Sequence, residues 1–276
     1  MTRSSGQAAT APLELAGRVA IVTGGGSGIG RATALLLAER GARVFVGDIH
    51  ARVDDDGQFA RLGITQLPCD VRRAADVARL IDTAVEAAGR LHIVVSNAGV
   101  NCPGQVPDVS EAAWDECLDT NLKGAFLCAK FAIPHLRQAG GGAIVHTASN
   151  AGLLPRAHDP VYSTSKGALV AFTRALALAH AGDRIRVNAV CPGPVTDTGM
   201  MAADLASAED AQAAAAQFIQ ASPLARAWGR MITPAEVAAA IAYLVSDAAA
   251  MVTGTLLAID GGKSLGVPPA STRCDN

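Results

Sequence analysis

Short apolar runs rich in valine and isoleucine alternate with longer alanine-rich segments along most of this chain of 276 residues. Strands that alternate with helices in this way predict a parallel sheet, and continuously apolar strands indicate that helices cover both of its faces. The runs that we expect to form strands cover 18–23, 43–48, 64–70, 91–96, 143–149, 184–191 and 255–260. The helical patterns cover 28–40, 74–88, 111–139, 161–181 and 234–246.

No linker, low-complexity segment or internal repeat interrupts this alternation. The sequence therefore predicts an α/β protein with one doubly wound Rossmann domain built on a seven-stranded parallel sheet. We expect that dinucleotide-binding and catalytic domain to cover 15–264, between a flexible N-terminal tail at 1–14 and a C-terminal tail at 265–276. Half of the residues are hydrophobic and only 17% are charged, which excludes a disordered chain.

Charge and composition argue against several kinds of partner. The net charge is −2 and aromatic residues make up 4%, so neither a basic surface nor a stacking platform for nucleic acid is expected. No 18-residue apolar stretch is free of charge, and the first twelve residues lack the apolar core of a signal peptide. The six cysteines show no CxxC spacing and the histidines form no HExxH motif, which predicts reduced thiols and no metal site. We therefore expect a cytoplasmic protein without membrane or nucleic-acid partners.

A glycine-rich turn follows the first expected strand and opens the first helix, with the sequence Thr23-Gly24-Gly25-Gly26-Ser27-Gly28-Ile29-Gly30. Glycines at 24, 28 and 30 would let the backbone approach a pyrophosphate and let the helix pack closely on the strand. The exposed N–H groups and the dipole of that helix would favour the anion. In this strand–turn–helix context, the turn predicts a dinucleotide site.

Asp48 ends the second expected strand and distinguishes between the two nicotinamide dinucleotides. Its carboxylate can accept hydrogen bonds from the adenosine ribose hydroxyls and would repel a 2′-phosphate. Arg52, four residues later, is a candidate partner for such a phosphate. Asp48 favours NAD as the cofactor, with NADP as the weaker alternative.

Tyr162 and Lys166 lie four residues apart at the start of the helix expected over 161–181, so they share a face of it. A cation about 5 Å from the phenol, at an effective dielectric of about 20, contributes on the order of 3 kcal/mol. That energy would lower the pKa of Tyr162 by about two units from its usual ~10. Ser149 ends the fifth expected strand, where its hydroxyl would hold a substrate oxygen next to the phenol.

Taken in order, these motifs resemble those of the short-chain dehydrogenase/reductase family over about residues 15–262. The resemblance rests on Thr23-Gly24-x-x-x-Gly28-x-Gly30, Asp70-Val71, Asn97-Ala98-Gly99, Asn121, Ser149, Tyr162-x-x-x-Lys166, Asn188, Pro192-Gly193 and Asp260-Gly261-Gly262.

The resemblance implies a role for each catalytic candidate. Tyr162 would be the general acid/base, and Ser149 would orient the reacting oxygen. Lys166 would lower the pKa of Tyr162 and bind the nicotinamide ribose, while Asn121 would hold a water that relays protons to Lys166. The implied cofactor contacts are Gly24, Ser27, Gly28, Ile29, Gly30, Asp48, Asp70, Val71, Asn97, Ala98, Gly99, Tyr162, Lys166, Pro192, Gly193, Val195, Thr196 and Thr198.

Some positions depart from the family pattern, which often places an asparagine where Ser96 stands and a threonine five residues after the proline of Pro192-Gly193. The latter position is Asp197, so either Thr196 or Thr198 is the candidate for the nicotinamide amide. Substrate selection is expected from 100–107, 150–160 and the insert 196–228, which could form a helical lid. Its candidate lid residues are mostly apolar and favour a hydrophobic or cyclic secondary alcohol, whereas Arg156 and His158 could meet an acidic or polyol substrate. The lid candidates are Met200, Met201 and Phe218.

The sequence thus predicts an NAD(H)-dependent oxidoreductase that acts on a small-molecule secondary alcohol or ketone. One alternative is an NADPH-dependent reductase of 3-oxoacyl thioesters on a carrier protein. Asp48 and the presence of only four lysines argue against this alternative. A second alternative is a non-catalytic nucleotide-binding sensor, which would not need the four catalytic candidates. The resemblance also implies a homotetramer built through the helices at 111–139 and 161–181 and the last strand.

Overall fold

The computed structural model describes residues 14–50, 56–154 and 156–266. Arg52 and most of both expected tails lie outside the described residues. Within those three ranges, no helix is both long and apolar enough to cross a membrane.

Seven strands form one parallel sheet in the order β3-β2-β1-β4-β5-β6-β7, which confirms the predicted doubly wound fold. β1 pairs with β2 on one side and with β4 on the other, so the direction of winding reverses between β1 and β4. Ligands bind outside the carboxyl ends of the strands at such a switch point. The strands are β1 (Val19–Thr23), β2 (Arg43–Asp48), β3 (Thr65–Pro68), β4 (Ile93–Ser96), β5 (Gly142–Thr147), β6 (Ile185–Pro192) and β7 (Leu256–Ile259).

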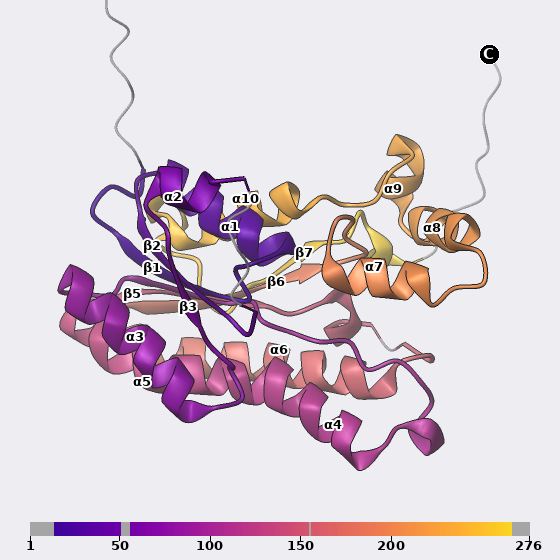
Figure 1. The fold of residues 1–276 in the computed structure, drawn as a ribbon, viewed down its shortest axis with the longest axis horizontal. Helices are drawn as coiled ribbons and strands as arrows, with labels where there is room; N and C mark the ends of the chain where they lie inside the picture. Colours follow the sequence, from indigo (N-terminus) through magenta and orange to yellow (C-terminus); the bar gives the residue numbers. More distant parts are fainter. Residues whose placement is uncertain (1–13, 51–55, 155, 267–276) are drawn as a thin grey trace, which may run out of the picture.

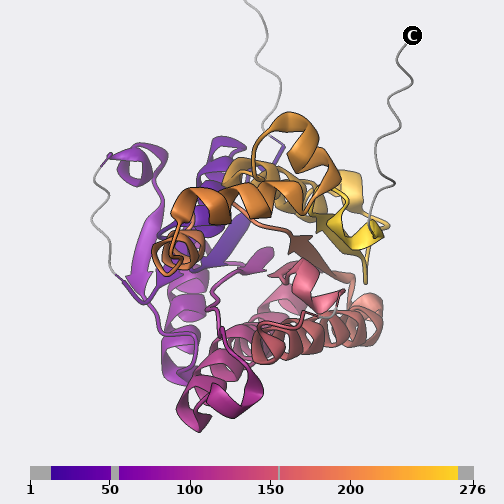
Figure 2. The same cartoon turned by 90° about the vertical axis from the view of Figure 1, so that its right-hand side faces the viewer.

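Helices cover both faces of the sheet (Figure 1). One face carries α1 (Gly28–Glu39), α2 (Gln58–Leu62) and α10 (Pro234–Val245). The other face carries α3 (Ala74–Ala88), α4 (Glu111–Leu118), α5 (Gly124–Gln138) and α6 (Pro160–His180). Three further helices lie near the end of the sheet that faces the viewer in Figure 2: α7 (Gly199–Ala206), α8 (Ala211–Gln220) and α9 (Pro223–Trp228).

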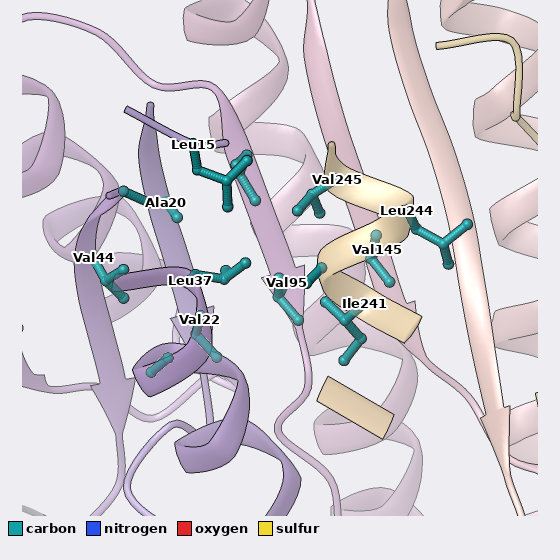
Figure 3. Packing of buried hydrophobic residues seen from close by; sticks show 14 of the residues in the cluster. Leu15, Ala20, Val22, Leu37, Val44, Val95, Val145, Ile241, Leu244 and Val245 are labelled. Atoms are coloured by element: carbon teal, nitrogen blue, oxygen red, sulfur yellow. The ribbon is translucent and has the colours of Figure 1, made fainter. Parts of the chain in front are cut away.

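The two layers of helices explain why the strands are apolar throughout. Ala20 and Val22 of β1 pack with Leu37 of α1 and Ile241 of α10 in one cluster, shown in Figure 3. The alternate residues of β1 pack with α3 and α5 in the opposite cluster. The central strands β1 and β4 are therefore buried on both faces, as the sequence predicts for a parallel sheet, whereas the edge strands β3 and β7 are partly exposed.

The structure differs from the sequence prediction in two places that matter for the site. The single helix expected over 111–139 is divided by a π-helical turn at Asp119–Lys123, which joins α4 to α5. The turn brings Asn121 into the interior, where its side chain bonds the backbone of Val100. The unpredicted helix α2 is short, and buried Phe59 anchors it.

Candidate active site

A cavity of about 530 Å³ opens at the carboxyl ends of the strands, next to the switch point between β1 and β4. It brings together segments that are far apart in the chain, from the glycine turn to Lys263. Most of the predicted site residues line it. They are Gly24, Ser27, Gly28, Ile29, Asp48, Asp70, Val71, Asn97, Ala98, Gly99, Ser149, Tyr162, Lys166, Pro192, Gly193, Val195 and Thr198.

Three predicted site residues, Gly30, Asn121 and Thr196, do not line this cavity. Gly30 lies inside the first turn of α1, behind the glycine turn. The backbone N–H of Thr196 donates to the carbonyl of Ile232, while Thr198 caps α7 by accepting a hydrogen bond from Met201 N–H. Of the two candidate threonines, only Thr198 borders the cavity.

The glycine turn has the close packing that a pyrophosphate cradle requires. Gly24 and Gly28 adopt φ values of +63° and +51°, in the left-handed region that favours glycine. A Cβ on Gly30 would lie 2.1 Å from the Gly24 carbonyl oxygen, so only glycine allows α1 to start so close to β1. The first N–H groups of a helix have no partner within the helix, and those of α1 begin at the cavity. The turn fits a dinucleotide phosphate.

Asn97 ties the ends of three neighbouring strands together under the cavity. Its Nδ2 donates to the carbonyl oxygens of Thr23 and Gly24, each at 3.2 Å. Its Oδ1 accepts from the Thr147 hydroxyl at 3.1 Å. The amide thus fixes β1 and the glycine turn against β4 and β5, which gives the cavity a rigid floor.

The Asp48 carboxylate lines the cavity at the end of β2. Oδ2 accepts the Gly26 N–H at 2.9 Å, and Oδ1 accepts the His50 N–H at 3.0 Å. Each oxygen keeps a lone pair that can accept a further hydrogen bond from a diol. Arg72 also lines the cavity, but the Asp70 and Glu116 carboxylates engage its guanidinium at 2.8 and 3.2 Å. This end of the cavity suits a ribose diol better than a phosphate.

Ser149, Tyr162 and Lys166 are all buried and all line the cavity. Ser149 follows β5 and caps a short 3-10 turn, accepting the Ala151 N–H at 3.1 Å. Tyr162 and Lys166 share one face of α6, and Lys166 Nζ lies 5.7 Å from the centre of the Tyr162 ring. Nζ also donates to the Thr147 carbonyl at 3.0 Å. The three side chains converge as the sequence predicts.

The ionisation of Tyr162 differs from the sequence prediction. Burial raises the pKa of the phenol to about 12, although the Ser149 side chain and the Arg156 charge lower it. Burial also lowers the pKa of Lys166 to about 8. The expected two-unit decrease in the pKa of Tyr162 is wrong for this structure, because it counted the attraction of the ammonium and omitted the desolvation of both groups. Tyr162 is a neutral phenol at pH 7.

Asn121 lies behind the candidate catalytic side chains. Its amide exchanges two hydrogen bonds with the Val100 backbone, at 2.9 and 3.0 Å, and donates to the Ser165 hydroxyl at 3.0 Å. A Cβ on Gly99 would lie 3.1 Å from Asn121 Oδ1 and 3.3 Å from Lys166 Nζ. Asn121 therefore holds the segment after β4 close to Lys166.

The predicted insert is helical and contributes to the cavity wall. Met200 and Met201 of α7 and Phe218 of α8 line it, as do Arg156 and His158 from the segment before α6. Asp204 and Lys263 also line it, and sequence reasoning missed both. No sequence motif lies around Asp204 that would indicate a site residue. Lys263 directly follows the Asp260-Gly261-Gly262 motif, which was a signal that it lies near the site.

Comparisons with known proteins agree with this geometry. A family model described as enoyl-(acyl carrier protein) reductase matches residues 24–264. The chain is 43% identical over 249 residues to cis-4-hydroxycyclohexanecarboxylate dehydrogenase of Sinomonas cyclohexanicum, a match that covers 89% of this chain and 96% of that protein. It is 39% identical over 255 residues to 4-formylbenzenesulfonate dehydrogenase of Comamonas testosteroni, covering 90% and 98%.

Among solved structures, that of levodione reductase is similar, with a TM-score of 0.85 and 31% identity over 92% of this chain and 100% of that chain. The family match runs from the glycine turn to the segment after β7, so it includes all of the predicted catalytic residues. On this evidence the chain belongs to the short-chain dehydrogenase/reductase family.

Proposed function

We propose that the chain is an NAD(H)-dependent oxidoreductase that transfers a hydride between nicotinamide and a secondary alcohol or ketone. One observation carries this proposal. The buried phenol, ammonium and hydroxyl of Tyr162, Lys166 and Ser149 converge on the same cavity that the glycine turn and Asp48 line. A proton-transfer group and a dinucleotide cradle thus share one enclosed space, as hydride transfer to a carbonyl requires.

The cofactor would supply or accept the hydride. In the direction of reduction, the neutral Tyr162 donates its phenolic proton to the carbonyl oxygen of the substrate, and in oxidation the phenolate takes it back. Ser149 holds that oxygen by a hydrogen bond. Lys166 stabilises the phenolate by its charge and offers N–H donors to the ribose. Asn121 acts through Lys166 by fixing the segment after β4.

We propose a small cyclic secondary alcohol or ketone as the substrate. The two relatives described above are named for ring compounds that carry a hydroxyl or a formyl group. In this chain, Met200, Met201 and Phe218 supply apolar surface to the cavity that Tyr162 also lines. The carrier-protein alternative has support in the description of the matching family model. The carboxylate of Asp48 disfavours the NADPH that this alternative needs.

Asp48 provides the test of cofactor choice. We expect NAD(H) to bind at least about tenfold more tightly than NADP(H), because the carboxylate repels a 2′-phosphate and accepts from a diol. In Asp48→Ala the Michaelis constant for NAD should rise about tenfold, and the preference should disappear. Titration of both cofactors against each protein measures this. Tighter binding of NADP(H) by the unaltered protein would overturn the assignment.

We propose that the protein is a cytoplasmic homotetramer. Phe126 of α5 and Leu178 of α6 are exposed on the two helices expected at the interface, and Leu178 is 84% exposed in the single chain. Burial of such side chains between copies would stabilise the assembly. The cysteines of the described ranges are free and buried, which suits a reducing compartment. Light scattering should give four times the 28.0 kDa chain mass, and a monomer would refute the assembly.

A further inference from the structure

Two cationic side chains, those of Arg156 and Lys263, line the cavity, and the catalytic scheme above uses neither of them. Arg156 precedes α6, and Lys263 follows β7. Both line the cavity, with Arg156 Cζ 5.8 Å from the centre of the Tyr162 ring. The burial of Lys263 and its proximity to the Arg156 charge both lower the pKa of Lys263. Two like charges therefore line the same cavity and act on each other, and Arg156 lies beside the proposed proton donor.

Arg156 has donors that its protein partners leave unused. Nη2 lies 2.8 Å from the Asp159 carboxylate and 2.8 Å from His158 Nε2. Nε is buried and has no hydrogen-bond partner among the described residues. Among the described residues only Nη2 has partners, so the Nη1 donors remain for an acceptor in the cavity that Arg156 lines, and a guanidinium binds a carboxylate best through two parallel N–H groups.

Lys263 is half-buried, and its ammonium makes no hydrogen bond or ion pair within the described part of the chain, although its backbone N–H donates to the Asp260 carbonyl. The Asp260 carboxylate, three residues earlier, accepts the backbone N–H groups of Gly262 and Ser264 at 2.9 and 2.8 Å. Asp260 makes no ion pair with the ammonium, although its charge and that of Asp159 act to raise the pKa of Lys263 against the larger effect of burial. A partly desolvated cation without a partner is costly, and an anion in the cavity would compensate it.

The other carboxylates of this region have partners of their own. Asp159 is buried and is held by Arg156 and by the Ser163 hydroxyl at 3.3 Å. Asp204 accepts from Asn101 Nδ2 at 3.1 Å. Asp159 therefore contacts Arg156, whereas no carboxylate among the described residues forms an ion pair with Lys263.

We infer that Arg156 and Lys263 form an anion subsite that binds a carboxylate on the substrate and thereby holds the reacting carbon beside Tyr162. This inference rests on the proposed function and narrows it to small ring alcohols or ketones that carry a carboxylate. The two cations are specificity-determining residues, because they contact the substrate away from the carbon that exchanges hydride. The apolar wall formed by the lid candidates accommodates the ring.

Binding of two inert ring compounds tests the subsite directly. We expect cyclohexanecarboxylate to bind the NADH-loaded protein at least about tenfold more tightly than cyclohexanecarboxamide, as measured by calorimetry. Arg156→Gln and Lys263→Met should each weaken binding of the carboxylate about tenfold and leave that of the carboxamide unchanged. Arg137→Gln is the matched control, because Arg137 pairs with Asp183 on the surface and does not line the cavity. Arg156→Gln leaves the buried Asp159 carboxylate without its ion-pair partner. If that variant does not fold, Lys263→Met still tests the subsite.

The kinetics of a neutral and an anionic substrate separate this inference from the proposed function. For a hydroxycyclohexanecarboxylate, the Michaelis constant should rise about tenfold in Lys263→Met with kcat little changed, whereas the kinetics of this variant with cyclohexanol should not move. Equal binding of the carboxylate and the carboxamide, together with turnover of cyclohexanol, would overturn the subsite and leave the proposed function intact. The opposite result is that the protein binds the carboxylate selectively, that the variants lose this selectivity, and that no alcohol is turned over. That result would support the subsite and overturn the proposed function.

Discussion

Tyr162→Phe should lose turnover by about 10³-fold while keeping its affinity for NADH. The substitution removes the one proton that the scheme transfers to and from substrate oxygen, and positioned general acids contribute 10²–10⁴-fold. The ring itself packs in an apolar cluster with Cys102, Cys117 and Val161, so phenylalanine preserves the packing. Steady-state kcat and a fluorescence titration with NADH measure the two quantities.

The chain offers a matched control for this substitution, because it contains only two tyrosines. Tyr243 lies on α10, is 42% exposed and does not line the cavity. Tyr243→Phe should leave kcat and NADH affinity unchanged. Normal turnover by Tyr162→Phe would show that the phenol is not the acid/base, whatever else lines the cavity.

Gly30→Ala should destabilise the fold by about 2 kcal/mol or more and weaken NADH binding at least about tenfold. The added Cβ would lie 2.1 Å from the Gly24 carbonyl oxygen and 2.5 Å from Asn97 Nδ2. The first contact is with backbone that cannot rotate away, so α1 or the glycine turn must shift. Denaturant unfolding and an NADH titration measure the two effects.

Gly167→Ala is the control, since Gly167 is also a helical glycine. Its Cβ would meet no atom closer than Gly152 O at 4.0 Å, so alanine fits without a shift. Alanine is the better helix former, and this variant should be unchanged or more stable by about 0.5–1 kcal/mol. If the two variants lost equal stability, the close packing at Gly30 would not be the reason that glycine is required there.

The sheet and the convergence of the candidate catalytic residues could be predicted because each has a strong local signal. Continuously apolar strands mark a covered parallel sheet, and the carboxyl ends of such strands meet at one edge. That edge brings Gly24, Asp48, Asn97 and Ser149 around one cavity, although up to 125 residues separate them in the sequence. Periodicity and strand ends therefore predict where the cavity lies, whereas many of its individual residues, Asn97 among them, are predicted only by the family resemblance.

The features that could not be predicted from the sequence depend on the three-dimensional surroundings of the residues. The π-helical turn around Asn121 has no signal in an otherwise regular helical pattern, and its reason lies in bonds to Val100 and Ser165. The raised pKa of Tyr162 follows from burial, which spacing along a helix does not reveal. The approach of Lys263 to Arg156 joins residues more than a hundred positions apart through loops rather than strands.

Turnover by the purified protein tests the central claim most directly. A panel of cyclic secondary alcohols with NAD, and of the matching ketones with NADH, is followed by the absorbance of NADH, with NADP(H) run in parallel. The account predicts that at least one alcohol–ketone pair is turned over and that NAD(H) supports the faster rate. Tight binding of NADH without turnover of any member of the panel would contradict the account and favour a nucleotide-binding sensor.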